Sequence, residues 1–333
     1  MTKEPEIIVI GDCGQDIFLV LNPDCAHLGR GQHDLCLSYG AKLPILAKHD
    51  TVGGNAANAA TAFSRLGFET ALYTHVGGDD AGLRIRAEFR RNKIADTYVR
   101  IDRHHESNYN TILSLDGDRT ILSYHLERNY ALPRLADAHW VYLSSMRQGC
   151  EAIYDDLLGY LERSGAKLCF QPGTYQLSAG SESVSRLLKR CEIAVCNKEE
   201  AALYLKKEPD AHMYELLDGI RKLGPKIAVI TDGRDGAYAS DGAEYWHLDV
   251  IQDAPRVDTT GAGDAFAAGF TAAYAIGMPI AAALRWGQAE SSSVIGYYGA
   301  QAGLLHRNKL KTLLENYPDL IAKVATINTK HNS

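Results

Sequence analysis

Short apolar runs that alternate with helical patterns constrain the fold of this 333-residue chain most strongly. The strand pattern Glu6–Ile10 comes before a helical pattern at Ala56–Leu66 and a second strand pattern at Thr70–His75. The alternation returns between Trp140 and Thr231, where helical stretches of about 10–16 residues separate the strand patterns. This spacing is typical of right-handed βαβ crossovers, so it predicts an α/β fold with a mainly parallel central sheet.

Two stretches, residues 18–48 and 97–127, break this alternation because they contain β-type runs without a helical pattern. In the second stretch, Asn110–Leu115 and Thr120–Leu126 flank an Asp-Gly-Asp turn, which predicts a hairpin. We expect the two stretches to form a small sheet that covers a site at the strand ends, as a lid. The predicted division is a core of residues 1–17, 49–96 and 128–333 and a lid of residues 18–48 and 97–127.

Charge and composition disfavour several classes of protein. Lys and Arg number 35 against 41 Asp and Glu, which gives a net charge of −6, whereas nucleic-acid binding usually needs a basic excess. No stretch reaches the roughly 18 apolar residues of a membrane helix, and the N-terminus lacks a signal-peptide pattern. The seven cysteines are scattered without a CxxC pair, which favours a reducing compartment. We expect a cytoplasmic protein that binds neither nucleic acid nor a membrane.

The glycine-rich segment 258–264, with the sequence DTTGAGD, precedes a helix of small residues. The free N–H groups and the dipole at a helix start attract an anion, and glycines let a phosphate approach the backbone. Asp264 in the first turn places a carboxylate beside that anion site, where it could accept the proton of an attacking hydroxyl. From this motif alone a simpler alternative stays open, in which Asp264 only complements the helix dipole.

Five motifs in the same order resemble those of the ribokinase-like (PfkB) family of carbohydrate kinases. Residues 53–58, GGNAAN, followed by Gly67 and Gly77, resemble the N-terminal signature, and residues 258–270, DTTGAGDAFAAGF, the C-terminal one. Residues 197–200, NKEE, resemble the NxxE motif, and residues 231–236, TDGRDG, the nucleotide-loop motif TxGxxG. Gly11 to Asp16 resembles the first strand with its substrate-binding Asp. The resemblance covers nearly the whole chain.

This resemblance implies a Rossmann-like three-layer α/β core with a β-sheet lid, ATP as phosphoryl donor and Mg²⁺ as the required ion. It implies that Asp264 is the catalytic base and that the amides of Gly261, Ala262 and Gly263 form the anion hole. The acceptor would be held by Asp16, Gly53, Gly54 and Asn58, ATP by Thr231, Gly233 and Gly236, and Mg²⁺, through water, by Asn197 and Glu200. A monovalent cation such as K⁺ would bind carbonyl groups of Asp258 and Thr260, together with carbonyl groups of the later turn at residues 294–299.

The acceptor stays open at this point. Ribokinases carry an Asn where this chain has Gly14 and a Lys where it has Asn55, and such polar groups discriminate strongly between sugars. Ribose itself is therefore not expected, and a hexose, a ketose phosphate, a sugar acid or a nucleoside remain as acceptors. Four arginines in or beside the lid would suit an acidic or phosphorylated acceptor: Arg100, Arg103, Arg119 and Arg128.

The sequence leaves alternatives to a sugar kinase. An adenosine-type nucleoside kinase of the same family is one alternative, and a catalytically silent ligand-binding member is another, although the intact Asp264 argues against the latter. A dinucleotide-dependent oxidoreductase would need GxGxxG after the first strand, whereas residues 11–16 read GDCGQD. Finally, the exposed edges of a sheet-like lid predict a homodimer formed through the lid.

Overall fold

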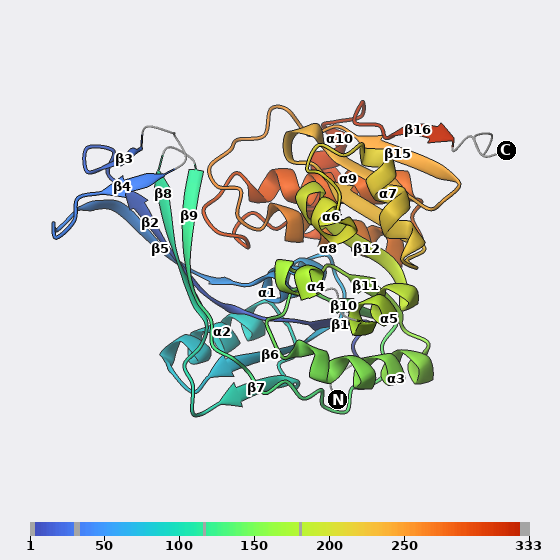
Figure 1. The fold of residues 1–333 in the computed structure, drawn as a ribbon, viewed down its shortest axis with the longest axis horizontal. Helices are drawn as coiled ribbons and strands as arrows, with labels where there is room; N and C mark the ends of the chain where they lie inside the picture. The colour runs from blue at the N-terminus through green and yellow to red at the C-terminus, as the bar shows by residue number, and fades with distance from the viewer. Residues whose placement is uncertain (1–3, 30–33, 116–117, 180–181, 327–333) are drawn as a thin grey trace.

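The computed structural model describes residues 4–29, 34–115, 118–179 and 182–326. Its main sheet has ten strands: β1 (Ile7–Ile10), β6 (Thr70–Gly77), β7 (Val99–Asp102), β10 (Trp140–Leu143), β11 (Lys167–Phe170), β12 (Cys191–Asn197), β13 (Ile227–Thr231), β14 (Ala237–Ser240), β15 (Glu244–Leu248) and β16 (Lys323–Thr326). They lie in the order β16-β15-β14-β13-β12-β11-β10-β1-β6-β7 (Figure 1). Neighbours from β7 to β13 are parallel, which confirms the predicted sheet, and β13 to β16 are antiparallel.

Helices cover both faces of this sheet. Because successive strand residues point to opposite faces, Ile7 and Val9 of β1 pack into one hydrophobic cluster and Ile8 and Ile10 into another. The first cluster includes α1 (Asn55–Arg65), α2 (Asp80–Arg91), α8 (Ala262–Ala275), α9 (Ile280–Val294) and α10 (Arg307–Glu315). The second includes the 3₁₀ turn η1 (Cys150–Ile153), α3 (Tyr154–Ser164), α5 (Glu182–Arg190), α6 (Lys198–Leu205) and α7 (Met213–Lys222). The expected three layers are therefore confirmed.

A four-stranded sheet projects from this core (Figure 1). It has the order β5 (Ile45–Gly53), β2 (Gly14–Leu21), β8 (Tyr109–Leu115) and β9 (Asp118–Tyr124), and β3 (Ala26–Leu28) pairs with β4 (Leu35–Leu37) beside it. The antiparallel pairing of β8 with β9 confirms the predicted hairpin, although Asp116 and Gly117 of its turn lie outside the described residues. Leu21, Ala26 and Leu115 form a small hydrophobic core for this part.

The limits of the small sheet differ from the predicted lid segments in two places. Residues 14–17 and 49–53, predicted as core, belong to the small sheet, because β2 and β5 pair from Gly14 and Gly53 onward. Strand β7, inside the predicted lid segment 97–127, pairs in parallel with β6 of the main sheet instead. A short β-type run indicates that a strand forms but not which strand it will pair with. The sequence pattern therefore assigned the start of β2, the end of β5 and strand β7 to the wrong part of the fold.

No helix within the described residues combines the length and the apolar character that a membrane-spanning helix needs.

Candidate active site

The predicted site residues gather where the parallel strands end. Loops after β1, β10, β11 and β12 leave the same edge of the sheet, which is where ligands bind in open α/β sheets. A cavity of about 460 Å³ lies there, bordered on its other side by β2, β8 and β9 of the small sheet. The predicted residues that line it are Asp16, Gly54, Asn58, Glu200, Thr260, Gly261 and Asp264.

Helix α8 places Asp264 in this cavity. Gly261 caps the helix in a left-handed conformation (φ 78°), and a Cβ there would lie 2.2 Å from the Cβ of Ala300, so the position requires glycine. Space within 4 Å of Gly263 is open on the side where a Cβ would lie. The N–H of Ala262 donates to the carbonyl of Thr259 at 3.3 Å, so this amide of the predicted anion hole already has a weak partner.

Two amide side chains hold the carboxylate of Asp264, a residue that is only 6% exposed. Asn58 Nδ2 donates to Oδ2 at 2.9 Å, and Gln171 Nε2, from the loop after β11, donates to Oδ1 at 3.1 Å. Burial raises the pKa of Asp264 to about 6, and these two hydrogen bonds oppose the rise. A general base works best when its pKa lies near the operating pH, so the environment suits proton abstraction.

The contacts of Asn58 differ from those expected of a residue that holds acceptor hydroxyls. Its Nδ2 is engaged by Asp264, and its Oδ1 accepts a hydrogen bond from Gln301 Nε2 at 3.1 Å. The residue lines the cavity but is only 3% exposed. In this structure the polar atoms of Asn58 therefore support the carboxylate rather than the open cavity.

Asp16 lies on β2 with its carboxylate in the cavity. Its Oδ1 accepts a hydrogen bond from Asn110 Nδ2 at 2.8 Å, and His125 Nε2 lies 3.0 Å from Asn110 Oδ1. Burial raises the pKa of Asp16 to about 6, the Asn110 hydrogen bond opposes this, and the charges of Asp258 and Asp264 add to it. Gly54 starts α1 with φ 90°, and a Cβ there would lie 2.6 Å from Cys13 Cα, which explains the glycine.

Asn197 and Glu200 form a reciprocal capping box at the start of α6. The Asn197 side chain accepts from the Glu200 N–H at 2.8 Å, and Glu200 Oε2 accepts from the Asn197 N–H at 2.9 Å. Glu200 also lines the cavity, and burial raises its pKa. No group of three or more His, Cys, Asp or Glu in the described part of the chain could hold a metal ion by itself.

The predicted nucleotide residues Thr231, Gly233 and Gly236 lie beside this capping box and outside the cavity lining. Thr231 ends β13 directly opposite Asn197 of β12. The turn that follows is closed by the Asp232 N–H, which donates to the Gly236 carbonyl at 2.8 Å. The structure therefore brings these residues to the same edge of the sheet as Asp264, at the end of β13, which is the strand next to β12.

Asp258 ties together the two loops that were expected to bind a monovalent cation. Its Oδ1 accepts from the N–H and the hydroxyl of Thr260 at 3.0 and 2.8 Å, and its Oδ2 accepts from the Gly299 N–H at 3.0 Å. The carboxylate of Asp258 thus fixes the loop before α8 against the loop after α9.

Several cavity residues were not predicted from the sequence. Asp12 accepts hydrogen bonds from the Tyr130 hydroxyl at 2.9 Å and from the Arg147 N–H at 2.9 Å. Arg147 Nε contacts His125 Nδ1 at 3.3 Å, and burial, together with nearby arginines, lowers the pKa of His125 to about 4. Arg119 of β9 reaches across to the Thr259 hydroxyl. Asp12 lies within the segment from Gly11 to Asp16, but no role was assigned to it, and Arg119 is one of the lid arginines that were expected to suit an acidic or phosphorylated acceptor. Arg147 and His125 belong to no motif, so only their positions after a strand end or in the lid segment could have suggested them.

A buried carboxylate at a glycine-capped helix start, at the open edge of a parallel sheet, is the arrangement expected of a phosphotransferase with an alcohol acceptor. The family comparison agrees: the model described as "pfkB family carbohydrate kinase" matches residues 47–307. This chain belongs to the pfkB family of carbohydrate kinases.

Individual relatives extend over most of the chain. It is 28% identical over 314 residues to the ribokinase of Bacillus subtilis, covering 92% of this chain and 99% of the relative. It is 26% identical over 278 residues to the ATP-dependent 6-phosphofructokinase of Thermoanaerobacterium thermosaccharolyticum, covering 79% and 84%. The structure of Arabidopsis thaliana ribokinase complexed with ribose and ATP has a TM-score of 0.75 at 20% identity, covering 94% of this chain and 99% of that one. These likenesses confirm the ribokinase-like fold.

Proposed function

We propose that this protein transfers the γ-phosphoryl group of ATP to a hydroxyl of a sugar or sugar-like molecule, with Asp264 as the catalytic base. The carboxylate of Asp264 carries this proposal, since it is buried, lines the cavity and is held on both oxygens by amide donors. A base held in this way can take the proton of an acceptor hydroxyl as the hydroxyl attacks phosphorus. The amides around Gly261, Ala262 and Gly263 face developing charge on the transferred group.

The other groups of the proposed site divide between acceptor and nucleotide. Asp16, with Gly53 and Gly54, would hold acceptor hydroxyls, and Thr231, Gly233 and Gly236 would line the ATP site. Glu200 fits a Mg²⁺ site because Oε2 serves the helix cap and leaves Oε1 for a water-bound ion. Bound with ATP, Mg²⁺ would neutralise charge on the phosphate oxygens. A K⁺ ion at the carbonyls of Asp258 and Thr260 is a further part of the proposal.

Two arginines favour an acceptor that carries a phosphate or carboxylate group. Arg119 and Arg147 both line the cavity, and within the described residues neither guanidinium is ion-paired with a carboxylate, although the charge of Arg147 acts on Asp12. Arg119 Nε is buried, and the described part of the chain supplies no acceptor for it. Arginine binds phosphate and carboxylate in a bidentate manner, so an anionic substituent would satisfy these groups. The 6-phosphofructokinase relative carries a phosphorylated sugar in its name.

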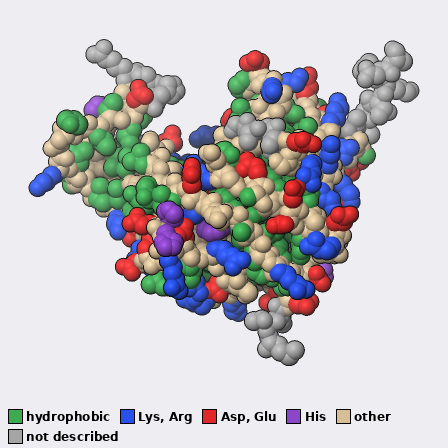
Figure 2. Space-filling view, turned by 60° about the horizontal axis from the view of Figure 1, so that its bottom comes forward, with side chains coloured by type: hydrophobic (Ala, Val, Ile, Leu, Met, Phe, Trp, Pro, Cys, Tyr) green, Lys and Arg blue, Asp and Glu red, His purple; other side chains and the backbone are tan. Residues whose placement is uncertain are grey.

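The small sheet would act as the lid of this site. Arg119 already bridges from β9 to Thr259 beside α8, so the sheet and the core meet across the cavity. Figure 2 shows hydrophobic side chains gathered over the projecting part, and its exposed large residues include Leu46, Ile121, Leu122 and Tyr124. We propose that a second copy of the chain covers this face.

All seven cysteines are unpaired, which supports a reducing, cytoplasmic compartment.

A panel of acceptors with ATP and Mg²⁺ tests the proposal. The panel should pair each neutral sugar with a phosphorylated or acidic analogue and should include nucleosides, with ADP release and the mass of the product as readouts. We expect a phosphorylated product with at least one sugar-like acceptor, and faster turnover of the anionic member of a pair. Turnover restricted to nucleosides would favour the nucleoside-kinase alternative. A complete lack of turnover would favour a silent ligand-binding protein.

A further inference from the structure

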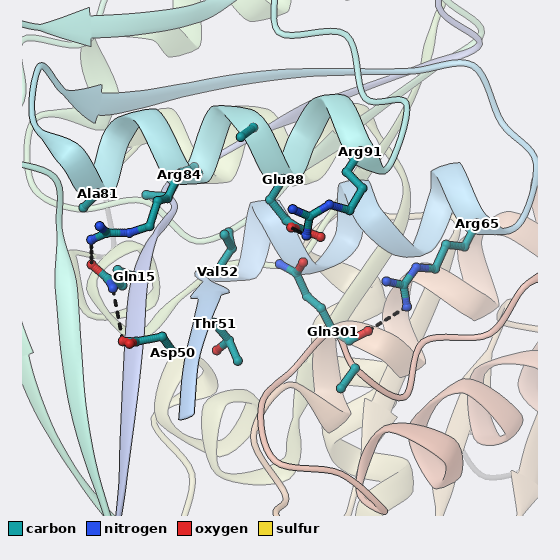
Figure 3. A pocket seen from close by; sticks show the side chains of 13 residues that line it. Gln15, Asp50, Thr51, Val52, Arg65, Ala81, Arg84, Glu88, Arg91 and Gln301 are labelled. Atoms are coloured by element: carbon teal, nitrogen blue, oxygen red, sulfur yellow. Dashed lines mark hydrogen bonds and ion pairs between the residues drawn. The ribbon is translucent and has the colours of Figure 1, made fainter. Parts of the chain in front are cut away.

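Gln301 reaches the proposed catalytic base through one intervening side chain. It lies between α9 and α10, is 8% exposed, and points its amide toward α1. Its Nε2 donates to Asn58 Oδ1 at 3.1 Å, and its Oε1 lies 3.3 Å from the Thr61 hydroxyl. Its backbone carbonyl accepts from Arg65 Nη1 at 2.7 Å, a contact drawn in Figure 3. Gln301 is therefore anchored to α1 through both its backbone and its side chain.

The hydrogen bonds in this chain of side chains have one consistent direction. An ionised carboxylate only accepts hydrogen bonds, so Asn58 must turn its NH₂ toward Asp264 and its carbonyl oxygen away. That oxygen needs a donor, which the NH₂ of Gln301 supplies. If the Asn58 amide turned around, its oxygen would face the carboxylate, and two acceptors would be in contact. The direction of the Gln301 amide and the ionised form of Asp264 thus support each other.

We propose that Gln301 is a positioning residue, which holds the Asn58 amide with its N–H groups toward Asp264. This inference rests on the proposed function, in which Asp264 is the base. The opposite oxygen of Asp264 is held in the same manner, since the Tyr142 hydroxyl donates to Gln171 Oε1 and Gln171 Nε2 donates to Asp264. Each carboxylate oxygen therefore has an amide donor whose direction is fixed by a further side chain.

The surroundings of Asp264 explain why these donors matter. Among the described residues, the titratable groups that interact with Asp264 are Asp16 on β2, Glu200 on α6 and Tyr142 on β10. All three are acids, so none of them favours the ionised carboxylate, and burial disfavours it as well. The amide donors are the groups that oppose burial at this position.

Gln301 also borders a second cavity, of about 400 Å³, which shares no lining residue with the active-site cavity (Figure 3). Helix α2, the end of β5 and the start of β2 form its other walls, including Arg84, Thr51 and Gln15. Because the side chain has free space beside it, a substitution of similar size should be accommodated without displacing α1. This makes Gln301 a practical position for mutation.

The test measures the pH profile of kcat for Gln301→Leu and Gln301→Glu in the full-length protein. Leucine removes the donor, so we expect the acid limb of kcat to move up by about one pH unit. The activity of this variant should then be about tenfold below wild type near pH 5 and about twofold below it near pH 7, and it should recover at higher pH. Glutamate would draw the Asn58 NH₂ toward itself and turn the Asn58 oxygen to Asp264. The acid limb of Gln301→Glu should therefore move to a still higher pH than that of Gln301→Leu. KM for the acceptor should change little in either variant.

Gln288→Leu is the matched control, because Gln288 is 5% exposed and bonds to Ser292 on its own helix at 2.8 Å. It removes a buried amide without contact to the chain of side chains and should leave the pH profile unshifted. If both Gln301 variants lose activity equally at every pH, or keep the wild-type limb, the positioning role is wrong. If Asp264→Asn retains turnover, the proposed function fails instead, and the two failures are thereby distinguished.

Discussion

The carboxylate of Asp16 lies directly over Gly53. A Cβ built on Gly53 would lie 1.9 Å from Asp16 Oδ2, far inside any real contact. Asp16 on β2 pairs with Thr51 on β5, so Gly53 is the next residue along β5 on the same face. The carboxylate of Asp16 occupies the space of a Cβ at position 53, so this position requires glycine. The N-terminal glycine motif thereby leaves room for the side chain of Asp16, which comes much earlier in the chain.

Gly53→Ala should therefore displace the Asp16 carboxylate. We expect KM for the acceptor to rise about 10- to 100-fold with a smaller change in KM for ATP, because Asp16 is proposed to bind acceptor hydroxyls. The free energy of unfolding should fall by about 1–3 kcal/mol because of the steric clash. Gly159→Ala is the matched control, since a Cβ there meets only the flexible end of Arg163. An unchanged acceptor KM would show that Asp16 does not bind the acceptor.

Activity should fall on the acidic side of pH 6. The pKa values of Asp264 and Asp16 are each raised to about 6, so below that pH both carboxyl groups become protonated. We expect kcat/KM to fall about tenfold per pH unit below this point, and more steeply where both groups must be ionised. A profile of kcat/KM from pH 4.5 to 9 measures this. An acid limb that begins only below pH 5 would contradict the burial of the base in the free enzyme.

Glu200→Gln separates a metal role from a capping role. The amide oxygen can still accept the Asn197 N–H, so the helix cap and the melting temperature should be retained. Loss of the charge should raise the Mg²⁺ concentration needed for half-maximal activity by about tenfold. Glu199→Gln changes an exposed acid in the same turn and is the control. Equal Mg²⁺ dependence in both variants would leave Glu200 with a structural role only.

Arg119→Gln tests the lid and the charge of the acceptor together. The substitution removes the guanidinium that contacts Thr259, so we expect KM for an anionic acceptor to rise about 10- to 100-fold. KM for the neutral analogue should rise less, because its substituent makes no ion pair. Arg103→Gln, an exposed arginine outside the cavity, serves as control. Equal effects on the two acceptors would show that Arg119 closes the lid without recognising charge.

Much of the core could be predicted from the sequence, since residues of the parallel strands are buried on both faces and form continuous apolar runs, as in β1 and β10. Glycine positions such as Gly54 and Gly261 were also informative, because their backbone conformation or contacts exclude other residues. Strand β16 was not predicted, because its pairing with β15 depends on a partner far away in the chain.

The side chains that hold the proposed base could not be predicted from the sequence either. Gln171 and Gln301 lie in loops without a motif, and they meet Asp264 and Asn58 only after the sheet and helices have assembled. Their distances in sequence from the residues that they contact, 93 and 243 positions, leave no local pattern. The motifs therefore indicated Asp264 as the proposed base, whereas the folded structure was needed to show which side chains hold its carboxylate.

The most direct test of the account compares phosphoryl transfer by the wild-type protein and Asp264→Asn, with an acceptor from the panel. Asparagine keeps the size of the side chain but cannot accept a proton, so we expect kcat to fall about 10²–10⁴-fold while the protein remains folded. Asp155→Asn, at an exposed ion pair with Arg186, should retain wild-type activity. Wild-type turnover by Asp264→Asn would contradict the assignment of Asp264 as the catalytic base.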